Sequence, residues 1–352
     1  MNQILLSFGI ILLIHAQPMA QGCATVRNIS EFGQYVQQDL GTISSPWIVS
    51  INNRYYKAYR DFRGTEDVTP DPQNETINRN FTTEFAISRL LNHGWSMTMV
   101  VPIMANSREA SREHGGPDTE RFTQHAFGLG DITFTVYKWL LDPVRANKGN
   151  VQIGLGFKLP TGDFIQKDYF HRPDTLIVAP VNPGIQPGDG GLGLIAEVNA
   201  YYRITDPLHL YANLYYMANP RVHNGESWGG FSYTEEQVEA GIDVMSVPDA
   251  FSLRAGVSYD ILSNLTLSGG LRFEGVPVRD LIGGSTGSRR PGYYLSIEPG
   301  FVFRTNTVSF FGSVPIFISR DIKQSVGGEI LGVHGPGGSA DYMVFLGALF
   351  KI

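Results

Sequence analysis

The residues with the most evident chemistry are two arginines, Arg254 and Arg272, and two glutamates, Glu274 and Glu298. The two arginines are equidistant in sequence from Ser263, so a hairpin that turns there would place them opposite each other. Neighbouring guanidinium groups repel unless a carboxylate or a bound anion lies between them, and the two glutamates are the expected partners. Two interpretations follow. One is a positively biased constriction that favours anionic or polar aromatic solutes, and the other is an internal ion-pair network that only fills space.

Further ionisable and aromatic residues occupy the same polar phase of a two-residue repeat. With the arginines and glutamates they form the predicted set of lumen-lining, solute-contact residues: Glu84, Lys158, Glu197, Arg203, Tyr211, Arg254, Arg272, Glu274 and Glu298. His209 and Arg304 share this phase, and so do Tyr201 and Tyr215. The tyrosines could stack on ring-shaped solutes or simply fill the interior.

These side chains require strands to position them. The clearest alternation of apolar and polar residues covers 194–203, 208–216, 251–260 and 265–274. Period two over eight to ten residues predicts a strand, and this length suits a tilted strand that crosses a membrane. Weaker segments are 47–59, 81–91, 95–104, 128–140, 150–159, 292–303, 307–319 and 341–350. Three of them contain a proline, Pro102, Pro299 or Pro315, and we expect bulges there because proline cannot donate to a ladder.

Long and short connections alternate between these segments. The long ones cover about 60–80, 105–127, 160–191, 217–250, 275–291 and 320–340. A soluble β-sandwich has no reason to sort its loops in this way, whereas a membrane barrel does. The predicted fold is therefore all-β: a transmembrane antiparallel β-barrel of about 12 strands, with short periplasmic turns, long extracellular loops and both ends on the short-turn side. We expect loop 160–191 or loop 217–250 to fold inward.

The composition agrees with a barrel that is apolar outside and wet inside. Of 352 residues, 42% are hydrophobic and 17% charged, with 40 Gly, 21 Phe and 16 Tyr. The mean hydropathy of −0.08 is too low for a bundle of membrane helices. The net charge of −6, without a basic stripe, argues against nucleic acid as a partner.

The N-terminal region predicts export. The apolar run 4–14 is too short to span a bilayer and matches the core of a signal peptide. The expected organisation is a signal peptide at 1–20, an N-terminal periplasmic segment at 21–46 and the barrel at 47–352, in the outer membrane of a bacterium. The single cysteine, Cys23, cannot form an internal disulfide. It is either the lipidated first residue of a mature lipoprotein or an incidental thiol.

Several short phrases resemble the outer-membrane barrel family named after the MetA pathway of phenol degradation. They are Gly128-Leu129-Gly130-Asp131, Leu159-Pro160-Thr161-Gly162, Arg290-Pro291-Gly292-Tyr293, Glu298-Pro299-Gly300 and Ser313-Val314-Pro315, in the family's order. The resemblance covers most of the chain from about residue 45. It implies a transporter of small compounds, with aromatic ones among the candidates, and no catalytic residues. This sequence departs from common outer-membrane barrels at its end, where Phe350 is followed by Lys351 and Ile352.

The sequence therefore predicts a porin-like channel or transporter for small solutes, aromatic or anionic ones among them. One alternative is a surface binding or adhesion protein anchored by a closed barrel. Another is an outer-membrane lipid hydrolase, for which His223 and Ser227 are the nearest candidates. We expect no enzyme activity, no cofactor and no metal site. The expected partners are outer-membrane lipid, a small-molecule solute and, during biogenesis, the barrel-assembly machinery.

Overall fold

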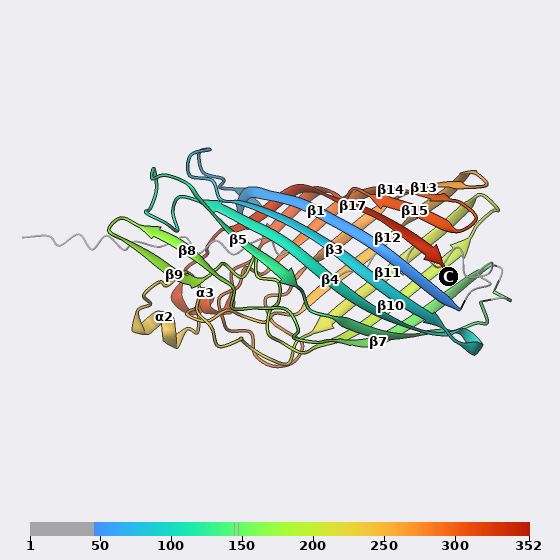
Figure 1. Ribbon diagram of the computed structural model, residues 1–352, viewed down its shortest axis with the longest axis horizontal. Helices are drawn as coiled ribbons and strands as arrows, with labels where there is room; N and C mark the ends of the chain where they lie inside the picture. Colours follow the sequence, from blue (N-terminus) through green and yellow to red (C-terminus); the bar gives the residue numbers. More distant parts are fainter. Residues whose placement is uncertain (1–45, 144, 147) are drawn as a thin grey trace, which may run out of the picture.

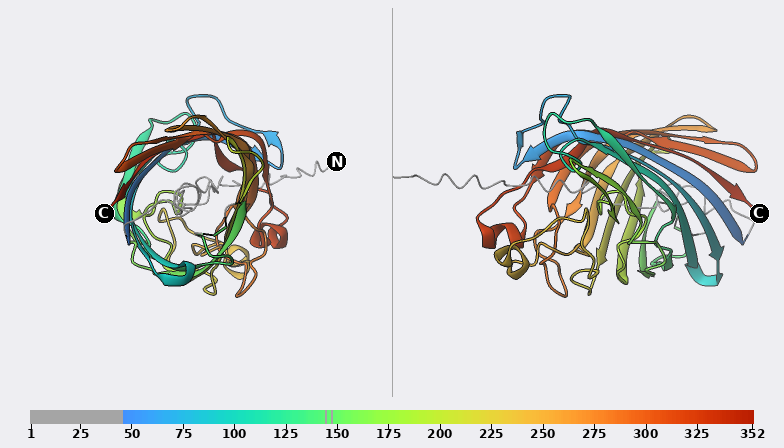
Figure 2. Two further views of the ribbon diagram at one scale, coloured as in Figure 1. Left: turned by 90° about the vertical axis from the view of Figure 1, so that its right-hand side faces the viewer. Right: turned by 60° about the vertical axis from the view of Figure 1, so that its left-hand side comes forward.

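Twelve antiparallel strands close into a barrel in the computed structural model, which describes residues 46–143, 145–146 and 148–352 (Figures 1 and 2). The strands are β1 (Trp47–Arg63), β3 (Ile77–Leu90), β4 (Trp95–Ala110), β5 (Phe122–Leu129) with β6 (Thr133–Trp139), β7 (Gly149–Lys158), β10 (Gly193–Arg203), β11 (Leu208–Ala218), β12 (Ala250–Leu262), β13 (Leu265–Val276), β14 (Gly292–Arg304), β15 (Val308–Ser313) with β16 (Ile316–Ile322), and β17 (Gly337–Lys351). In the wall, β5 and β6 together form one strand, written β5–β6, and β15 and β16 together form another, written β15–β16. The predicted fold class is confirmed.

The loops sort by length between the two ends of the barrel, as predicted (Figure 1). The short turns lie at the end where the chain finishes, and one of them contains the helix η1 (Asn92–Gly94). The opposite end carries the long loops with β2 (Glu66–Asp67), the hairpin β8 (Lys167–Arg172) and β9 (Thr175–Pro180), α2 (Glu235–Glu239) and α3 (Val326–Leu331). The N–H of Ile352 donates to the carbonyl of Trp47 at 3.1 Å, so both ends of the barrel lie on the short-turn side.

First and last strands close the wall. β1 pairs with β17 from Ile48 opposite Lys351 to Phe62 opposite Gly337. Seen end-on, the strands form a continuous ring (Figure 2). The predictions for the signal peptide, for residues 21–45 and for Cys23 lie outside the described residues.

The two faces of the wall differ in polarity. On β13, Leu267, Leu271 and Phe273 are exposed on the outer face, while Arg272 and Glu274 are buried on the inner face. The same alternation runs through the neighbouring strands, so apolar side chains cover the outside. This polarity is the reverse of that of a soluble barrel and is typical of a barrel surrounded by lipid. Among the described residues, no helix is long and apolar enough to cross a membrane.

Breaks in the ladder occur near the three prolines. Opposite Pro102, the β5–β6 strand carries one extra residue, and the N–H of Gly130 donates to the proline carbonyl. This β-bulge confirms one of the three that the prolines predict. At Pro299 and Pro315 the pairing is interrupted without an extra residue on either strand, so the prediction of bulges at these two prolines is wrong. The β15–β16 strand has its extra residue at Ile318 instead, because Leu295 pairs with Ser319 and Ser296 pairs with Phe317.

The inner face is not uniformly polar. Two clusters of buried hydrophobic side chains line β14, β15–β16, β17 and β1 and reach β3 and β4, on the same phase as the buried polar residues of those strands. We call them together the apolar strip: Tyr56, Ala58, Phe62, Tyr294, Phe317, Ile322, Ala340, Met343 and Phe345, followed by Ile48, Ala86, Val100, Val302, Phe311 and Leu349. The sequence did not predict this strip.

Candidate solute-contact site in the lumen

A buried ion-pair network lies on the inner faces of β12, β13 and β14. Arg254 pairs with Arg272 in register across the hairpin, as their equal distances from Ser263 predict. Arg254 donates to Glu298 through Nε at 2.9 Å and through a terminal nitrogen at 2.6 Å. Arg272 donates to Glu274 at 2.9 and 3.0 Å and lies 3.8 Å from Glu298. Glu298 therefore joins the two arginines, and the expected partners are the ones observed.

The charges in this network balance. The side chains of Arg254, Arg272, Glu274 and Glu298 are each 2% exposed or less. Buried charges must be paired, and here two cations face two carboxylates. This geometry favours the internal ion-pair network over a positively biased constriction. The network also borders the apolar strip, because the Arg272 guanidinium lies 5.1 Å from the ring centre of Phe345.

A second polar cluster surrounds Glu197 on β10. Its carboxylate accepts hydrogen bonds from the Tyr137 hydroxyl at 2.8 Å and from the amides of Asn199 and Asn213 at 3.0 Å each. Tyr215 stands opposite Glu197 in the β10–β11 register. Its hydroxyl is buried and has no hydrogen-bond partner among the described residues. A polar solute group could satisfy this hydroxyl.

The remaining predicted side chains are distributed along the barrel. Glu84 accepts from the amide of Asn52 at 3.3 Å, on another part of the wall. The hydroxyl of Tyr211 lies over Gly256 and Gly270, where an added Cβ would come within 2.6 and 2.4 Å of it. Arg203 lies near the short turns and is paired with Asp206 at 3.6 Å, so it does not join the network at Arg254.

Lys158 fixes the longest loop to the barrel wall. Its buried ammonium group lies 3.1 Å from Asp131, at the β5–β6 bulge, and also contacts Asp189 at the far end of the loop. Asp131 accepts a further hydrogen bond from the N–H of Gly162 at 2.9 Å. Both ends of loop 159–192 are thus held at one point, beside the mouth of the barrel.

The middle of this loop turns into the mouth. The inward-facing amides of Asn80 and Asn106 donate to the carbonyls of Gly184 and Ile185 at 3.1 and 2.9 Å. Ile185 is fully buried and packs with Val181 and Ala126. Of the two loops expected to fold inward, 160–191 makes these contacts with inward-facing residues of the wall.

Four of the five phrases behind the family resemblance meet in two pairs. The Thr161 hydroxyl donates to the Gly130 carbonyl at 2.9 Å, which joins the first phrase to the second. The N–H of Val314 donates to the Pro299 carbonyl at 3.0 Å, and Ser313 donates to Glu298 at 3.0 Å, which joins the fourth to the fifth. These residues therefore shape the bends of the wall and support the ion-pair network.

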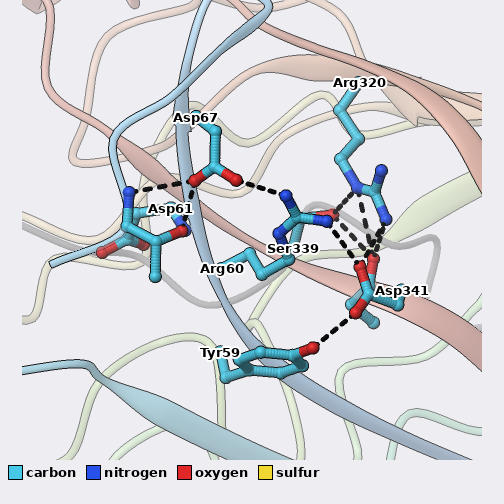
Figure 3. A network of polar contacts seen from close by, with 9 residues as sticks. Tyr59, Arg60, Asp61, Asp67, Arg320, Ser339 and Asp341 are labelled. Carbon is cyan, nitrogen blue, oxygen red and sulfur yellow. Dashed lines mark hydrogen bonds and ion pairs between the residues drawn. The ribbon is translucent and has the colours of Figure 1, made fainter. Parts of the chain in front are cut away.

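A charged network lies at the closing seam of the barrel (Figure 3). Asp341 on β17 accepts from Arg60 at 3.0 Å, from Arg320 at 3.0 Å and from the Tyr59 hydroxyl at 2.5 Å. Arg60 also contacts Asp67. The network lies where the β1–β17 register shifts between Ala58 and Arg60, so side chains reinforce the seam where the ladder is irregular.

The candidate residues for hydrolysis are not arranged as a nucleophile and its base. Ser227 lies in loop 219–249 and its hydroxyl donates to the carbonyl of Asp243 at 2.5 Å. His223 forms an isolated bridge with Ser246. Across residues 46–352, apart from 144 and 147, no group of three His, Cys, Asp or Glu side chains could hold a metal ion.

Comparisons with known proteins bear on the fold. No protein-family model and no curated protein matches the sequence, so the family resemblance stays a prediction. Among solved structures, the chain is similar to the COG4313 outer membrane channel from Pseudomonas putida F1, with a TM-score of 0.59 and 11% identity over 87% of this chain and 95% of that one. The CymD monoaromatic hydrocarbon channel matches at a TM-score of 0.43 and 10% identity, over 95% and 98% of the two chains. The first similarity supports the outer-membrane barrel fold.

Proposed function

We propose that this protein is an outer-membrane channel for small solutes. The observation that carries the proposal is a closed twelve-stranded wall that is apolar outside and holds buried charge inside. Barrels of about eight strands are filled by side chains, and those of about sixteen leave an aqueous channel, so twelve strands suit a narrow passage. The chain's structural similarity to a protein described as an outer membrane channel supports the same function.

The proposed solutes are small ring-bearing molecules with a polar or anionic group. The support is the chemistry of the inner face, where the paired Arg254 and Arg272 lie beside the ring of Phe345. All three side chains are buried, so a solute contacts them only by displacing their present partners. The unsatisfied Tyr215 hydroxyl offers a further polar contact. The proposed solute-contact set stays Glu84, Lys158, Glu197, Arg203, Tyr211, Arg254, Arg272, Glu274 and Glu298.

Liposome swelling tests this proposal. Full-length protein is reconstituted and challenged with neutral, anionic and aromatic solutes of matched size. We expect entry of small solutes, faster for benzoate than for a neutral sugar of similar mass. Planar bilayers would then show single-channel conductance. Arg254→Ser and Arg272→Ser should each shift the reversal potential towards cations, because the glutamates lose their partners. An unchanged reversal potential would remove the network from the conduction path.

A closed barrel that anchors a surface binding protein is the second candidate. The near-complete burial of the Arg254–Glu298 pair favours it, since a wide aqueous lumen would expose these side chains. This candidate requires that no solute enters the liposomes and that bilayers show no conductance.

A further inference from the structure

Four adjacent strands, β1, β3, β4 and β5, run side by side at the long-loop end (Figure 1). Their register sets out two ordered rows of side chains on the outer wall. The lower row follows the register Tyr55, Phe81, Ala105 and Phe127. The upper row lies two residues closer to the long-loop end on each strand. It consists of Lys57, Arg79, Ser107 and His125. An aromatic row therefore lies directly below a row that contains two permanent cations.

The height of these rows matches a membrane boundary. Trp95 is exposed on the outer face at the short-turn end of β4, and Ala105 lies ten residues further along the same strand. Ten residues at about 3.3 Å, tilted by about 40°, rise about 25 Å, which is the height of the apolar band of an outer-membrane barrel. The aromatic row then lies at the outer interface, and the cationic row about 5 Å higher, at the level of lipid head groups.

The two rows border a groove. Its volume is about 250 Å³, and its lining includes the outward-facing Arg79, Phe81, Ala105, Ser107, His125 and Phe127. The small side chains of Ala105 and Ser107 form the floor between Phe81 and Phe127. Phe127 is 67% exposed and Phe81 42%, so this aromatic surface is accessible from outside the barrel.

The charges in and above the groove balance overall, with the additional cation at Lys57 on the β1 side and the additional acid at Asp168 on the β5 side. Arg79 pairs with Glu109 at 3.0 Å, and the other oxygen of Glu109 lies 3.1 Å from Arg121. Arg121 also lies 3.8 Å from Glu75. These two acids and two arginines balance. Lys57, which lies over the Tyr59 ring at 4.8 Å, adds a cation beside Arg79, while Asp168 accepts the backbone N–H of His125 at 2.8 Å.

We propose that this groove binds a phosphorylated lipid of the outer leaflet. A phosphate lies against Lys57, Arg79 and the imidazole of His125, and one acyl chain runs over Ala105 between Phe81 and Phe127. The complementarity is twofold, since the cations meet the head group while the aromatic walls meet the chain. The inference rests on the insertion of the barrel in an outer membrane, but it does not require an open lumen.

Native mass spectrometry of the full-length protein, titrated with bisphosphorylated lipid A in detergent, measures the affinity. Each cation near a lipid surface contributes about fivefold to the affinity, so Lys57→Gln with Arg79→Gln should weaken binding about 25-fold. Ala105→Trp fills the groove without changing charge and should weaken binding at least fivefold. The matched control is Arg89→Gln, on the same strand and beside Trp47 at the short-turn end, which should bind as the wild type does.

Heat-modifiable migration in gels first verifies that each variant is a folded barrel. Equal affinity of Ala105→Trp and wild type would overturn the proposal, as would an equal loss in Arg89→Gln. Displacement of the lipid by millimolar inorganic phosphate would assign the site to a soluble phosphate and also overturn it. Bilayer conductance of the same samples separates the two proposals: lipid binding without conductance refutes only the channel, and conductance without binding refutes only the lipid site.

Discussion

Replacing Arg272 with methionine should strongly destabilise the barrel. The change keeps an unbranched side chain but removes the cation that lies 2.9 Å from the fully buried carboxylate of Glu274. At an effective dielectric constant of about 20, the lost attraction is about 6 kcal/mol. After the removed desolvation cost of arginine is subtracted, breaking a buried pair costs about 3–5 kcal/mol of the free energy of unfolding. Glu298 retains Arg254 at 2.6 Å, so the loss concerns Glu274.

An exposed pair of the same length provides the control. Arg279 and Glu329 also lie 2.9 Å apart, but their side chains are 63% and 43% exposed. Arg279→Met should therefore cost less than about 1 kcal/mol. Arg272→Met with Glu274→Gln removes both charges and should cost less than Arg272→Met alone. The assay is equilibrium urea unfolding from phospholipid vesicles, followed by tryptophan fluorescence. Similar losses for Arg272→Met and Arg279→Met would refute the argument that burial makes the inner pair strong.

Three further predictions follow from the loops and the wall. Lys158→Met should release loop 159–192 by leaving Asp131 and Asp189 together, and limited proteolysis should cut this loop faster; an unchanged rate would contradict its role as anchor. Gly156→Val should lower the free energy of unfolding by about 1–3 kcal/mol, because its Cβ would lie 2.3 Å from the Phe134 carbonyl oxygen. At Gly269 nothing lies within 4 Å of an added Cβ, so Gly269→Val should be tolerated. Equal unfolding midpoints for the two variants would refute this. Burial lowers the pKa of His114 from 6.5 to about 4, so its neutral form should stabilise the loop fully above pH 6.5, and this stability should be lost as pH falls towards 4. The hydrogen-exchange protection factors of residues 111–121, which correct for the pH dependence of intrinsic exchange, should fall over this range in the wild type and less in His114→Asn. Identical profiles would argue against His114 as the cause.

The sequence determines the wall well because the wall depends on local signals. Alternation within a strand and the length of each loop depend on neighbouring residues, so the twelve strands and their direction could be predicted. The register of Arg254 with Arg272 follows from one short turn. Once that register is set, Glu274 and Glu298 are the carboxylates within reach.

The remainder depends on contacts between distant segments. On β17, the consecutive residues Met343, Val344, Phe345 and Leu346 are all apolar, so alternation cannot indicate which face is inside, and the apolar strip was missed. The hydrogen bond from Tyr59 to Asp341 joins residues 282 positions apart. The lipid groove needs the register of four strands at once. No pattern within one segment contains such information.

The pairing of β1 with β17 also constrains biogenesis. Because the final strand supplies the partner of the first, a chain whose synthesis has not finished has two open edges. Such edges invite wrong pairing with other chains, and contacts between the two ends of a sequence form slowly. The whole polypeptide must therefore be present before the barrel can close, and a truncated C-terminus would leave β1 without its partner.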